Sequence, residues 1–335
     1  MKEIYPNIYR TIIEYDDQAA SPQNLYILRQ QERSLLIDTS YRFARAWETL
    51  NQMIIELDID YKKLDVFITH NHPDHIGYVH ELQQLGARIF MNPVESELKT
   101  DILQSYLSTN GSTFVNLRAM GVTKEIYPED YDMLVRNMSK KLVEREELYG
   151  FDFLPIHPGD ELEYGEYHFE VLDLKGHSLG QCGLYDKEHK ILFSGDQIME
   201  EIVPIAITQK RNQNLLRHYI DSLNEIKERY NDCLILPCHY GIVKNPKAEA
   251  ERILSSYNKL CHSILELLKK EDRWMVTRAI GVDTHGGKYR ASHYKKIMMT
   301  ALIWAKTFSC LEYLYEKGLV DRKEENGIIY WRYKI

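Results

Sequence analysis

Cysteine is scarce in this chain and is not arranged in pairs. The sequence has five cysteines, an odd number, and none of them forms a C-x-x-C pair. This usage argues against a disulfide framework and is typical of proteins from a reducing compartment. We therefore predict a cytoplasmic location.

Long apolar runs are also absent. No stretch approaches the roughly 18 to 20 consecutive apolar residues that a membrane-spanning helix needs. The first ten residues mix charged and apolar side chains, so we expect no secretory signal and no membrane partner. There is no internal repeat, glycine-rich phosphate-binding loop or Ser-His-Asp arrangement that would suggest a competing function.

The composition is ordinary for a globular protein. Hydrophobic residues make up 44% of the chain and charged residues 27%, which excludes disordered and fibrous architectures. At roughly 150 residues per domain, the length predicts about two domains, or one large α/β core with an appendage.

Charge is distributed unevenly within a net charge of -8. Residues 244–335 carry 18 Lys and Arg against 11 Asp and Glu, and residues 1–243 carry 24 against 39. The balances are +7 and -15. We predict two domains with these bounds, which are either two units with different functions or two solvated surfaces that complement each other.

Strand-like and helix-like segments alternate along the chain. Short runs of β-branched and aromatic residues predict strands, and apolar residues at helical spacing predict helices. Strands are expected at 8–15, 24–30, 34–40, 64–70, 87–93, 182–186, 190–196 and 233–237, with a hairpin at 161–174. Helices are expected at 43–57, 75–86, 213–230 and 248–270. This alternation predicts a layered α/β fold.

The segment from Thr69 to His75 holds three histidines and one aspartate. It follows a buried strand and precedes a helix. His70 and His72 can project together because side-chain direction in a strand repeats every two residues. Asp74 and His75 then lie at the turn into the helix, so one loop can supply ligands to two neighbouring metal ions. A set of imidazoles and carboxylates without thiolate suits a catalytic zinc, iron or manganese site.

Three more ligand-type residues follow strand-like runs. His177 lies in the sequence K-G-H-S-L-G, Asp196 in F-S-G-D-Q, and His239 in L-P-C-H-Y-G. Strand ends of one sheet meet at one edge, so we expect these residues to join the first segment in one site. Cys182 and Cys238 lie near them in sequence and are predicted to be small buried residues.

The H-x-H-x-D-H motif, followed by a GHS-type His, an SGD-type Asp and a late strand-end His, resembles the metallo-β-lactamase superfamily. The resemblance covers roughly residues 4–243, and the sequence L-L-I-D-T-S resembles that family's early L-I-D-T-G strand. It implies an α/β fold of four layers, an αββα sandwich. It also implies that His70, His72 and His177 bind a first metal, that Asp74, His75 and His239 bind a second, and that Asp196 bridges the two.

The predicted function follows from such a pair of metals. Two divalent ions, zinc above all with iron or manganese as alternatives, would lower the pKa of a shared water enough to give a metal-bridging hydroxide. We expect this hydrolase to cleave a small ester, thioester or lactone, with Asp74 orienting the hydroxide or shuttling a proton. Asp38 either supports a metal-bound histidine, as the family suggests, or caps a turn at a strand end.

The end of the chain resembles a winged helix. A segment at 274–281, a long helix near 299–320 and a hairpin to residue 335 are expected there. A metallo-β-lactamase domain with this module resembles the beta-lactamase-like protein 2 subfamily, which includes an endoribonuclease. Such modules bind nucleic acid, or only pack or form a homodimer. If RNA binds, the basic cluster Lys288, Arg290, Lys295 and Lys296 is the predicted contact, but the acidic body disfavours it.

Residues 95–150 are expected to form a helical insertion near the metal site. Their aromatic and Met content suits either an apolar pocket wall or the core of an ordinary helical hairpin. The alternatives to the small-substrate hydrolase are therefore a metal-dependent phosphodiesterase or endoribonuclease, and a non-catalytic binding protein on this fold. The seven ligand-type residues disfavour the last.

Overall fold

The computed structural model describes residues 1–15, 22–96, 117–125, 128, 131–132, 150–208, 211–285 and 294–335, the last range without the side chains of 294–300. Most of the predicted insertion at 95–150 lies outside these residues. Lys288, Arg290 and the side chains of Lys295 and Lys296 lie outside them as well.

The chain forms two compact units, each built from three segments. The first contains Met1–Lys99, Arg145–Pro204 and Ser222–Glu251, and the second contains Thr100–Glu144, Ile205–Asp221 and Arg252–Ile335. The single boundary after residue 243 remains a prediction from sequence.

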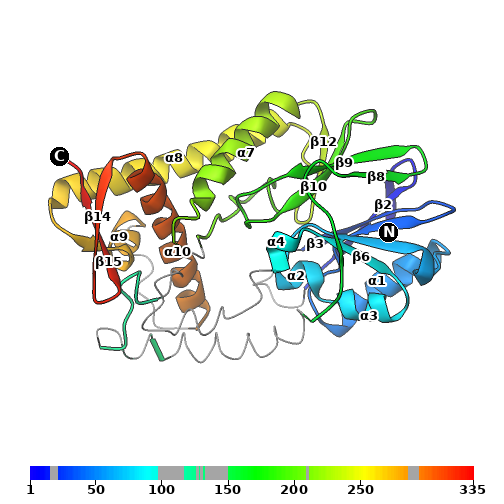
Figure 1. Cartoon of the computed structure of the whole chain (residues 1–335), viewed down its shortest axis with the longest axis horizontal. Helices are drawn as coiled ribbons and strands as arrows, with labels where there is room; N and C mark the ends of the chain where they lie inside the picture. Colours follow the sequence, from blue (N-terminus) through cyan, green and yellow to red (C-terminus); the bar gives the residue numbers. More distant parts are fainter. Residues whose placement is uncertain are drawn as a thin grey trace. The chain divides into compact units, whose positions relative to one another are not determined.

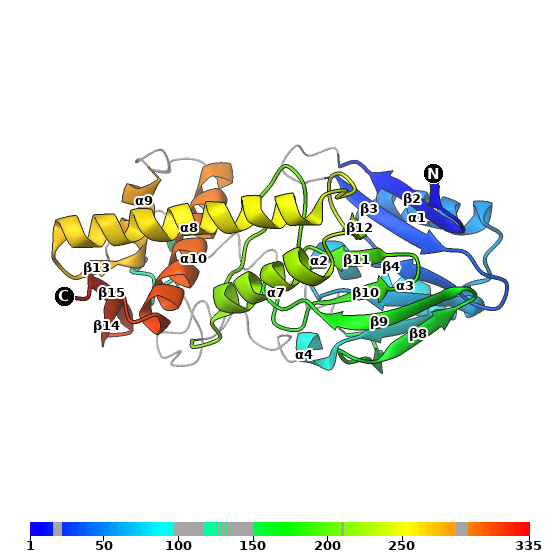
Figure 2. The same ribbon diagram turned by 90° about the horizontal axis from the view of Figure 1, so that it is seen from above.

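The first unit contains two β-sheets (Figures 1 and 2). The seven-stranded sheet runs in the order β1-β2-β3-β4-β5-β6-β7. Its strands are Lys2–Tyr5, Ile8–Ile13, Gln23–Leu28, Ser34–Ile37, Leu64–Ile68, Arg88–Met91 and Leu154–Pro155. Neighbouring strands from β1 to β4 are antiparallel, and neighbouring strands from β4 to β7 are parallel.

The second sheet runs in the order β12-β11-β10-β9-β8. In chain order its strands are Glu161–Tyr164, Tyr167–Asp173, Cys182–Asp186, Ile191–Gly195 and Leu234–Pro237. The predicted hairpin at 161–174 is present, with Gly165 at φ 63° in its turn. A left-handed turn residue is well suited to glycine because glycine has no Cβ.

Strand alternation explains how both faces of the seven-stranded sheet become buried. Tyr26, Leu28 and Phe67 point to a core shared with Phe169 and Phe193 of the second sheet. Their neighbours along the same strands, such as Ile27 and Val66, point to a second core on the opposite face, which the helices cover. Because side chains alternate across a strand, such strands read as continuous apolar runs. The predicted layered αββα fold is therefore confirmed.

Helices cover the outer face of the seven-stranded sheet. They are α1 (Ala44–Glu56), α2 (Pro73–Ile76) and α3 (Val79–Gln84), with Tyr61 of the one-turn η1 (Tyr61–Lys63) packed beside them. The short helix α4 (Pro93–Ser96) follows β6. The prediction of one helix at 75–86 was wrong, since α2 and α3 are separate. The break is at Gly77, whose N–H donates to the Ser40 carbonyl at 3.1 Å. A Cβ at this position would lie 2.3 Å from that oxygen.

The remaining helices are α7 (Leu215–Arg229), α8 (Pro246–Glu271), α9 (Thr277–Thr284) and α10 (Tyr294–Glu316). The long helix expected near 299–320 begins earlier and ends at Glu316. Among the described residues, no helix has the length and apolar character that crossing a membrane requires.

The second unit contains a small sheet of order β13-β15-β14, formed by Met275–Val276, Ile328–Tyr333 and Val320–Glu325. The predicted hairpin turns at Asn326 and Gly327, with φ 52° and 76°, the two positive angles of a type I′ turn. Trp331 is fully buried and donates its indole N–H to Thr277 Oγ1 at 3.0 Å. The assignment of these elements to a winged helix remains a prediction.

Candidate metal centre

The predicted ligand loop follows the buried strand β5. The strand ends at Ile68, and α2 begins at Pro73. Proline is favoured at the first helical position because its missing N–H would have no intrahelical acceptor there. His70 and His72 lie in the extended link before the helix, whereas Asp74 and His75 lie in its first turn.

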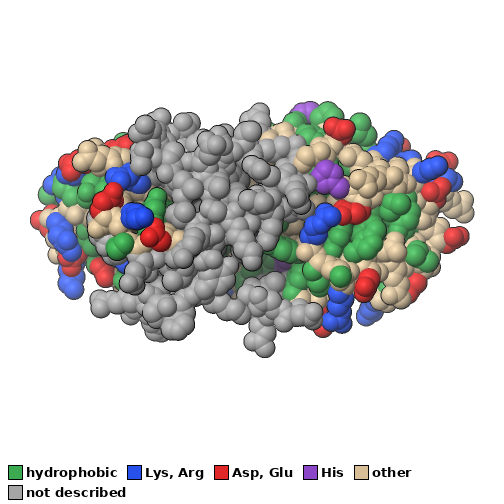
Figure 3. Space-filling model, turned by 90° about the horizontal axis from the view of Figure 1, so that it is seen from below, with side chains coloured by type: hydrophobic (Ala, Val, Ile, Leu, Met, Phe, Trp, Pro, Cys, Tyr) green, Lys and Arg blue, Asp and Glu red, His purple; other side chains and the backbone are tan. Residues whose placement is uncertain are grey.

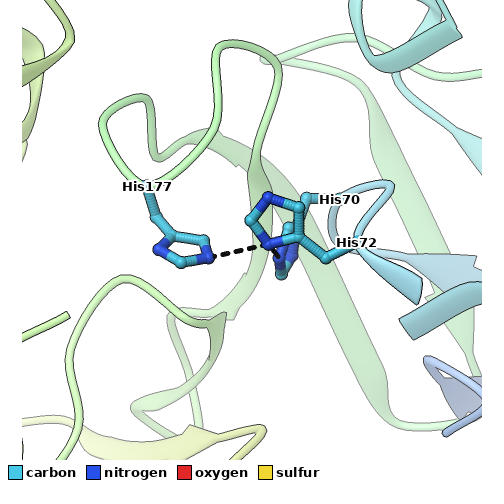
Figure 4. A group of neighbouring side chains, drawn as sticks. All are labelled: His70, His72 and His177. Carbon is cyan, nitrogen blue, oxygen red and sulfur yellow. Dashed lines mark hydrogen bonds between the residues drawn. The ribbon is translucent and has the colours of Figure 1, made fainter. Parts of the chain in front are cut away.

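Three histidines converge on one point in the first unit (Figure 4). His72 Nδ1 lies 2.9 Å from His70 Nε2 and 3.0 Å from His177 Nε2. The three ring nitrogens lie within 4.8 Å of one another. Three imidazole nitrogens at this spacing provide three of the four ligands of a tetrahedral metal site.

A second group lies beside the first. Asp74, His75 and His239 bring one ligand atom each within 4.8 Å of the others. His239 Nε2 is 3.2 Å from Asp74 Oδ2. All four predicted segments of the chain thus supply side chains to one region of the first unit.

Asp196 lies between the two groups. Its Oδ2 is 3.6 Å from His177 Nε2, a member of the first group. The same oxygen is 3.6 Å from His75 Nε2, and Oδ1 is 3.8 Å from His239 Nε2. A carboxylate that faces both groups has the position of a bridging ligand.

Hydrogen bonds on the far side of the rings fix three histidine tautomers. His75 Nδ1 donates to Asp38 Oδ2 at 2.8 Å, and His239 Nδ1 donates to the Pro22 carbonyl at 3.0 Å. His70 Nδ1 lies 3.1 Å from Thr69 Oγ1, whose own proton goes to Asp38. When these rings are neutral, as metal binding requires, the proton on Nδ1 leaves the Nε2 lone pair directed into the site. Metal-binding histidines are oriented in this way.

Asp38 makes the contacts that both of the roles left open by the sequence require. It accepts from the Thr69 backbone N–H at 2.8 Å, at the end of β5, and it also supports His75. The Thr69 hydroxyl and the Cys238 thiol also donate to Asp38 Oδ2, and the Cys238 Sγ lies 2.9 Å from that oxygen. Cys238 is therefore a hydrogen-bond donor as well as a small buried residue.

The electrostatics of the second group favour a cation. Burial disfavours a charged ring at His75, but the neighbouring carboxylates, led by Asp38, outweigh burial and raise its pKa well above the ordinary value. Burial disfavours ionised Asp74 and Asp196, but the surrounding imidazoles hold the pKa of both carboxyl groups well below the usual range. Ionised carboxylates therefore surround a point where positive charge is stabilised.

Two buried atoms test whether metal ions fit. Within the described part of the chain, His75 Nε2 and Asp196 Oδ1 are buried and have no hydrogen-bond partner. A buried polar atom left without a partner costs about 1–3 kcal/mol. Both atoms point into the groups just described, so metal coordination would satisfy them. The donor set fits divalent cations.

A family comparison agrees with this geometry. A model described as "Metallo-beta-lactamase superfamily" matches residues 19–239, about two-thirds of the chain. This chain belongs to the metallo-β-lactamase superfamily.

Two curated proteins are similar to this superfamily member over part of their length. Acyl-coenzyme A thioesterase MBLAC2 from Homo sapiens is 23% identical over 189 residues, which are 55% of this chain and 61% of that protein. An uncharacterized protein from Aquifex aeolicus (strain VF5) is 25% identical over 150 residues, 44% of this chain and 56% of that protein. The chain thus matches about three-fifths of the length of these relatives.

Two solved structures share the fold over nearly the whole chain. A metallo-beta-lactamase family protein from Thermus thermophilus gives a TM-score of 0.73 at 20% identity, covering 99% of this chain and all of that one. A beta-lactamase domain protein from Burkholderia ambifaria gives 0.80 at 19% identity, covering 99% and 94%. At this identity the similarity concerns the fold alone.

Sequence reasoning missed several residues that hold this superfamily site together. Gln23 donates from its side chain to the Asp74 carbonyl, and Gln181 Oε1 accepts from the Asp196 N–H at 3.3 Å. Glu95 contacts the loops on which His70 and His177 lie. No local motif marks these three, because each acts on residues distant in sequence.

Proposed function

We propose that this chain is a dinuclear metal-dependent hydrolase that cleaves a small ester, thioester or lactone. The observation that carries the proposal is the position of Asp196 between the two groups of ligand-type side chains. A binding protein has no need for two adjoining groups that share one carboxylate. Superfamily membership supports the hydrolase class.

In this proposal His70, His72 and His177 hold one metal ion, and Asp74, His75 and His239 hold the other, with Asp196 bridging. The donor set favours zinc, with iron or manganese as alternatives. Two bound divalent ions supply Lewis acidity and acidify water near neutral pH.

Asp74 is the residue proposed to handle protons. Its side chain is 29% exposed, whereas that of Asp196 is 8% exposed. Its carboxylate can accept a hydrogen bond from the attacking water and orient it, or take up the proton that this water loses and release it to the leaving group. Positioned acid–base groups of this kind contribute roughly 10²- to 10⁴-fold to rate.

A thioester is the favoured substrate class. The named relative that matches 55% of this chain is an acyl-coenzyme A thioesterase. Hydrolysis of a thioester needs attack of an activated water on one carbonyl carbon and requires no nucleic-acid surface.

Charge supports a small substrate over RNA. Residues 1–243, which contain all seven proposed ligands, carry a balance of -15, and this repels a long phosphate backbone more strongly than a small substrate with few phosphates. On the face drawn in Figure 3, positive and negative side chains are interspersed over the part of the chain that the structure describes. The nuclease alternative stays a prediction, because its proposed basic contacts lie outside that part.

The test is a hydrolysis screen on the full chain reconstituted with Zn²⁺, Fe²⁺ or Mn²⁺. Acyl-coenzyme A thioesters, esters, lactones and single-stranded RNA are assayed in parallel. We expect metal-dependent thioester hydrolysis that His177→Ala abolishes and that His157→Ala, at an exposed histidine, leaves unchanged. Hydrolysis that survives metal removal or His177→Ala would contradict the proposal.

A further inference from the structure

Glu95 is a fully buried carboxylate close to the proposed metal centre but outside both groups of ligand-type residues. It lies in the short helix α4, two residues after the start of that helix at Pro93. Burying a carboxylate is costly unless donors satisfy it. Its partners therefore indicate what the residue does.

Both oxygens of Glu95 accept hydrogen bonds, and they do so from two different loops. Oε2 accepts from the Asn71 N–H at 2.9 Å. Oε1 accepts from Ser178 Oγ and from the Gly180 N–H, each at 2.7 Å. The Asn71 side chain completes the arrangement by donating to the Glu95 backbone carbonyl.

These partners are sequence neighbours of the three converging histidines. Asn71 stands between His70 and His72, and Ser178 directly follows His177. One carboxylate thus connects the two backbone segments that place the three-histidine group. The nitrogens of His72 and His177, which lie 3.0 Å apart, come from these two segments.

Gly180 shows how closely the carboxylate approaches its loop. A Cβ at this position would lie 3.0 Å from Glu95 Oε1 and 2.9 Å from Val94 Cβ. The backbone can therefore approach the carboxylate only because residue 180 has no side chain. The close approach argues for a fixed connection between the loop and Glu95.

The donors also dictate the chemistry required at position 95. Backbone N–H groups donate and cannot accept. Because one such group faces each oxygen of Glu95, both oxygens must accept. A glutamine at this position would place an NH₂ group against a donor at one end and leave that buried donor unsatisfied.

We propose that Glu95 is a positioning residue that sets the spacing of the three-histidine metal site by joining its two loops. The inference rests on the metal site proposed above and is independent of the substrate. Partners that orient metal ligands in this way typically change metal affinity by about 10- to 100-fold when they are removed.

The experiment measures Co²⁺ affinity of the full chain by competition with a chromophoric chelator. The variants Glu95→Gln and Glu48→Gln are each made in a His239→Ala background. This background removes a ligand from the second group only. We expect Glu95→Gln to weaken Co²⁺ binding by about tenfold or more and to alter the visible spectrum of the bound ion. Glu48→Gln, at an exposed position on α1, is the matched control and leaves both unchanged.

Ser178→Ala provides a second, milder variant that removes one donor and leaves the carboxylate in place. We expect it to weaken Co²⁺ binding by a few-fold, and its effect to be smaller in the Glu95→Gln background because the two residues share a hydrogen bond. If Glu95→Gln does not fold, the Co²⁺ affinity of Ser178→Ala alone tests the proposal.

Unchanged Co²⁺ affinity in Glu95→Gln, or in Ser178→Ala when only that variant folds, overturns the proposal, even if thermal stability falls. If the parent chain with all its ligands binds no metal, the proposed function and this inference fail together. If the parent binds metal and the variants bind it equally well, only the role of Glu95 fails.

Discussion

Asp38 Oδ2 accepts a hydrogen bond from His75 Nδ1 at 2.8 Å, and both side chains are fully buried. This pairing leaves His75 Nε2 without a partner among the described residues. The side chain that orients the ring is thus separate from the side chains that would share a metal with it. A substitution of Asp38 should therefore change metal affinity although Asp38 is not itself a proposed ligand.

Asp38→Asn should weaken metal binding at the second group by about 10- to 100-fold, since an asparagine amide can present a donor to the His75 N–H. Metal titration of the purified full chain measures the effect. Asp58→Asn is the matched control, because Asp58 is exposed and has φ 52°, close to the 57° of Asp38. Equal metal affinity in Asp38→Asn and the parent would show that Asp38 does not orient His75 for metal binding.

Asp196→Ala should reduce the occupancy of both metal positions, because its carboxylate faces both groups. His239→Ala should affect mainly the second position. Elemental analysis of the two variants after identical reconstitution distinguishes them. Full metal content in Asp196→Ala would show that the bridge is assigned to the wrong residue.

Asp65 should make stability depend on pH. Burial raises its pKa, but hydrogen bonds from Arg88, Arg33 and Tyr164 outweigh burial and lower it below 3.8. A carboxyl group with a lowered folded-state pKa stabilises the fold above its unfolded pKa, and this contribution is lost as the pH falls through the folded value.

Asp65→Asn should therefore lower the free energy of unfolding by about 1.5–3 kcal/mol at pH 7, the range for hydrogen bonds to charged groups. Urea unfolding of the metal-free variant and parent should show this difference shrinking below about pH 3.8. A difference that stays constant as the pH is lowered would contradict the assignment.

RNA binding should be weak at moderate salt. Affinity for nucleic acid depends on the number of phosphates neutralised, so it falls steeply with salt when a basic cluster is engaged. Titration with single-stranded RNA at low and moderate salt, beside a cleavage assay, measures this. Tight, salt-sensitive binding with metal-dependent cleavage, abolished by Asp74→Ala, would favour the nuclease over the thioester hydrolase.

The strands could be predicted because their causes are local. The ligand-type residues do come together, but the expected reason, strand ends of one sheet, was wrong: β5 belongs to the seven-stranded sheet, and β9, β11 and β12 belong to the five-stranded sheet. Side-chain alternation and apolar runs mark the strands, whereas the packing of the two sheets that joins the ligand segments has no local signal. The helix break at Gly77 could not be predicted, because it depends on contact with Ser40, which is distant in sequence. Periodicity alone continues the helix through that position.

The supporting residues were hidden for the same reason. Glu95 is one acidic residue among many in the sequence, and its partners Asn71 and Gly180 carry no motif of their own. Its role depends on the fold bringing two loops to one carboxylate. The sequence could raise two roles for Asp38, but only the geometry shows that one side chain makes the contacts of both.

The metal content of the protein tests the central claim most directly. The full chain is reconstituted with Zn²⁺, freed of excess metal by gel filtration and assayed for metal and protein in the same sample. The account predicts about two equivalents of metal per chain, as a dinuclear hydrolytic site requires, with both lost on chelation. A protein that retains no more than one equivalent under these conditions would contradict it.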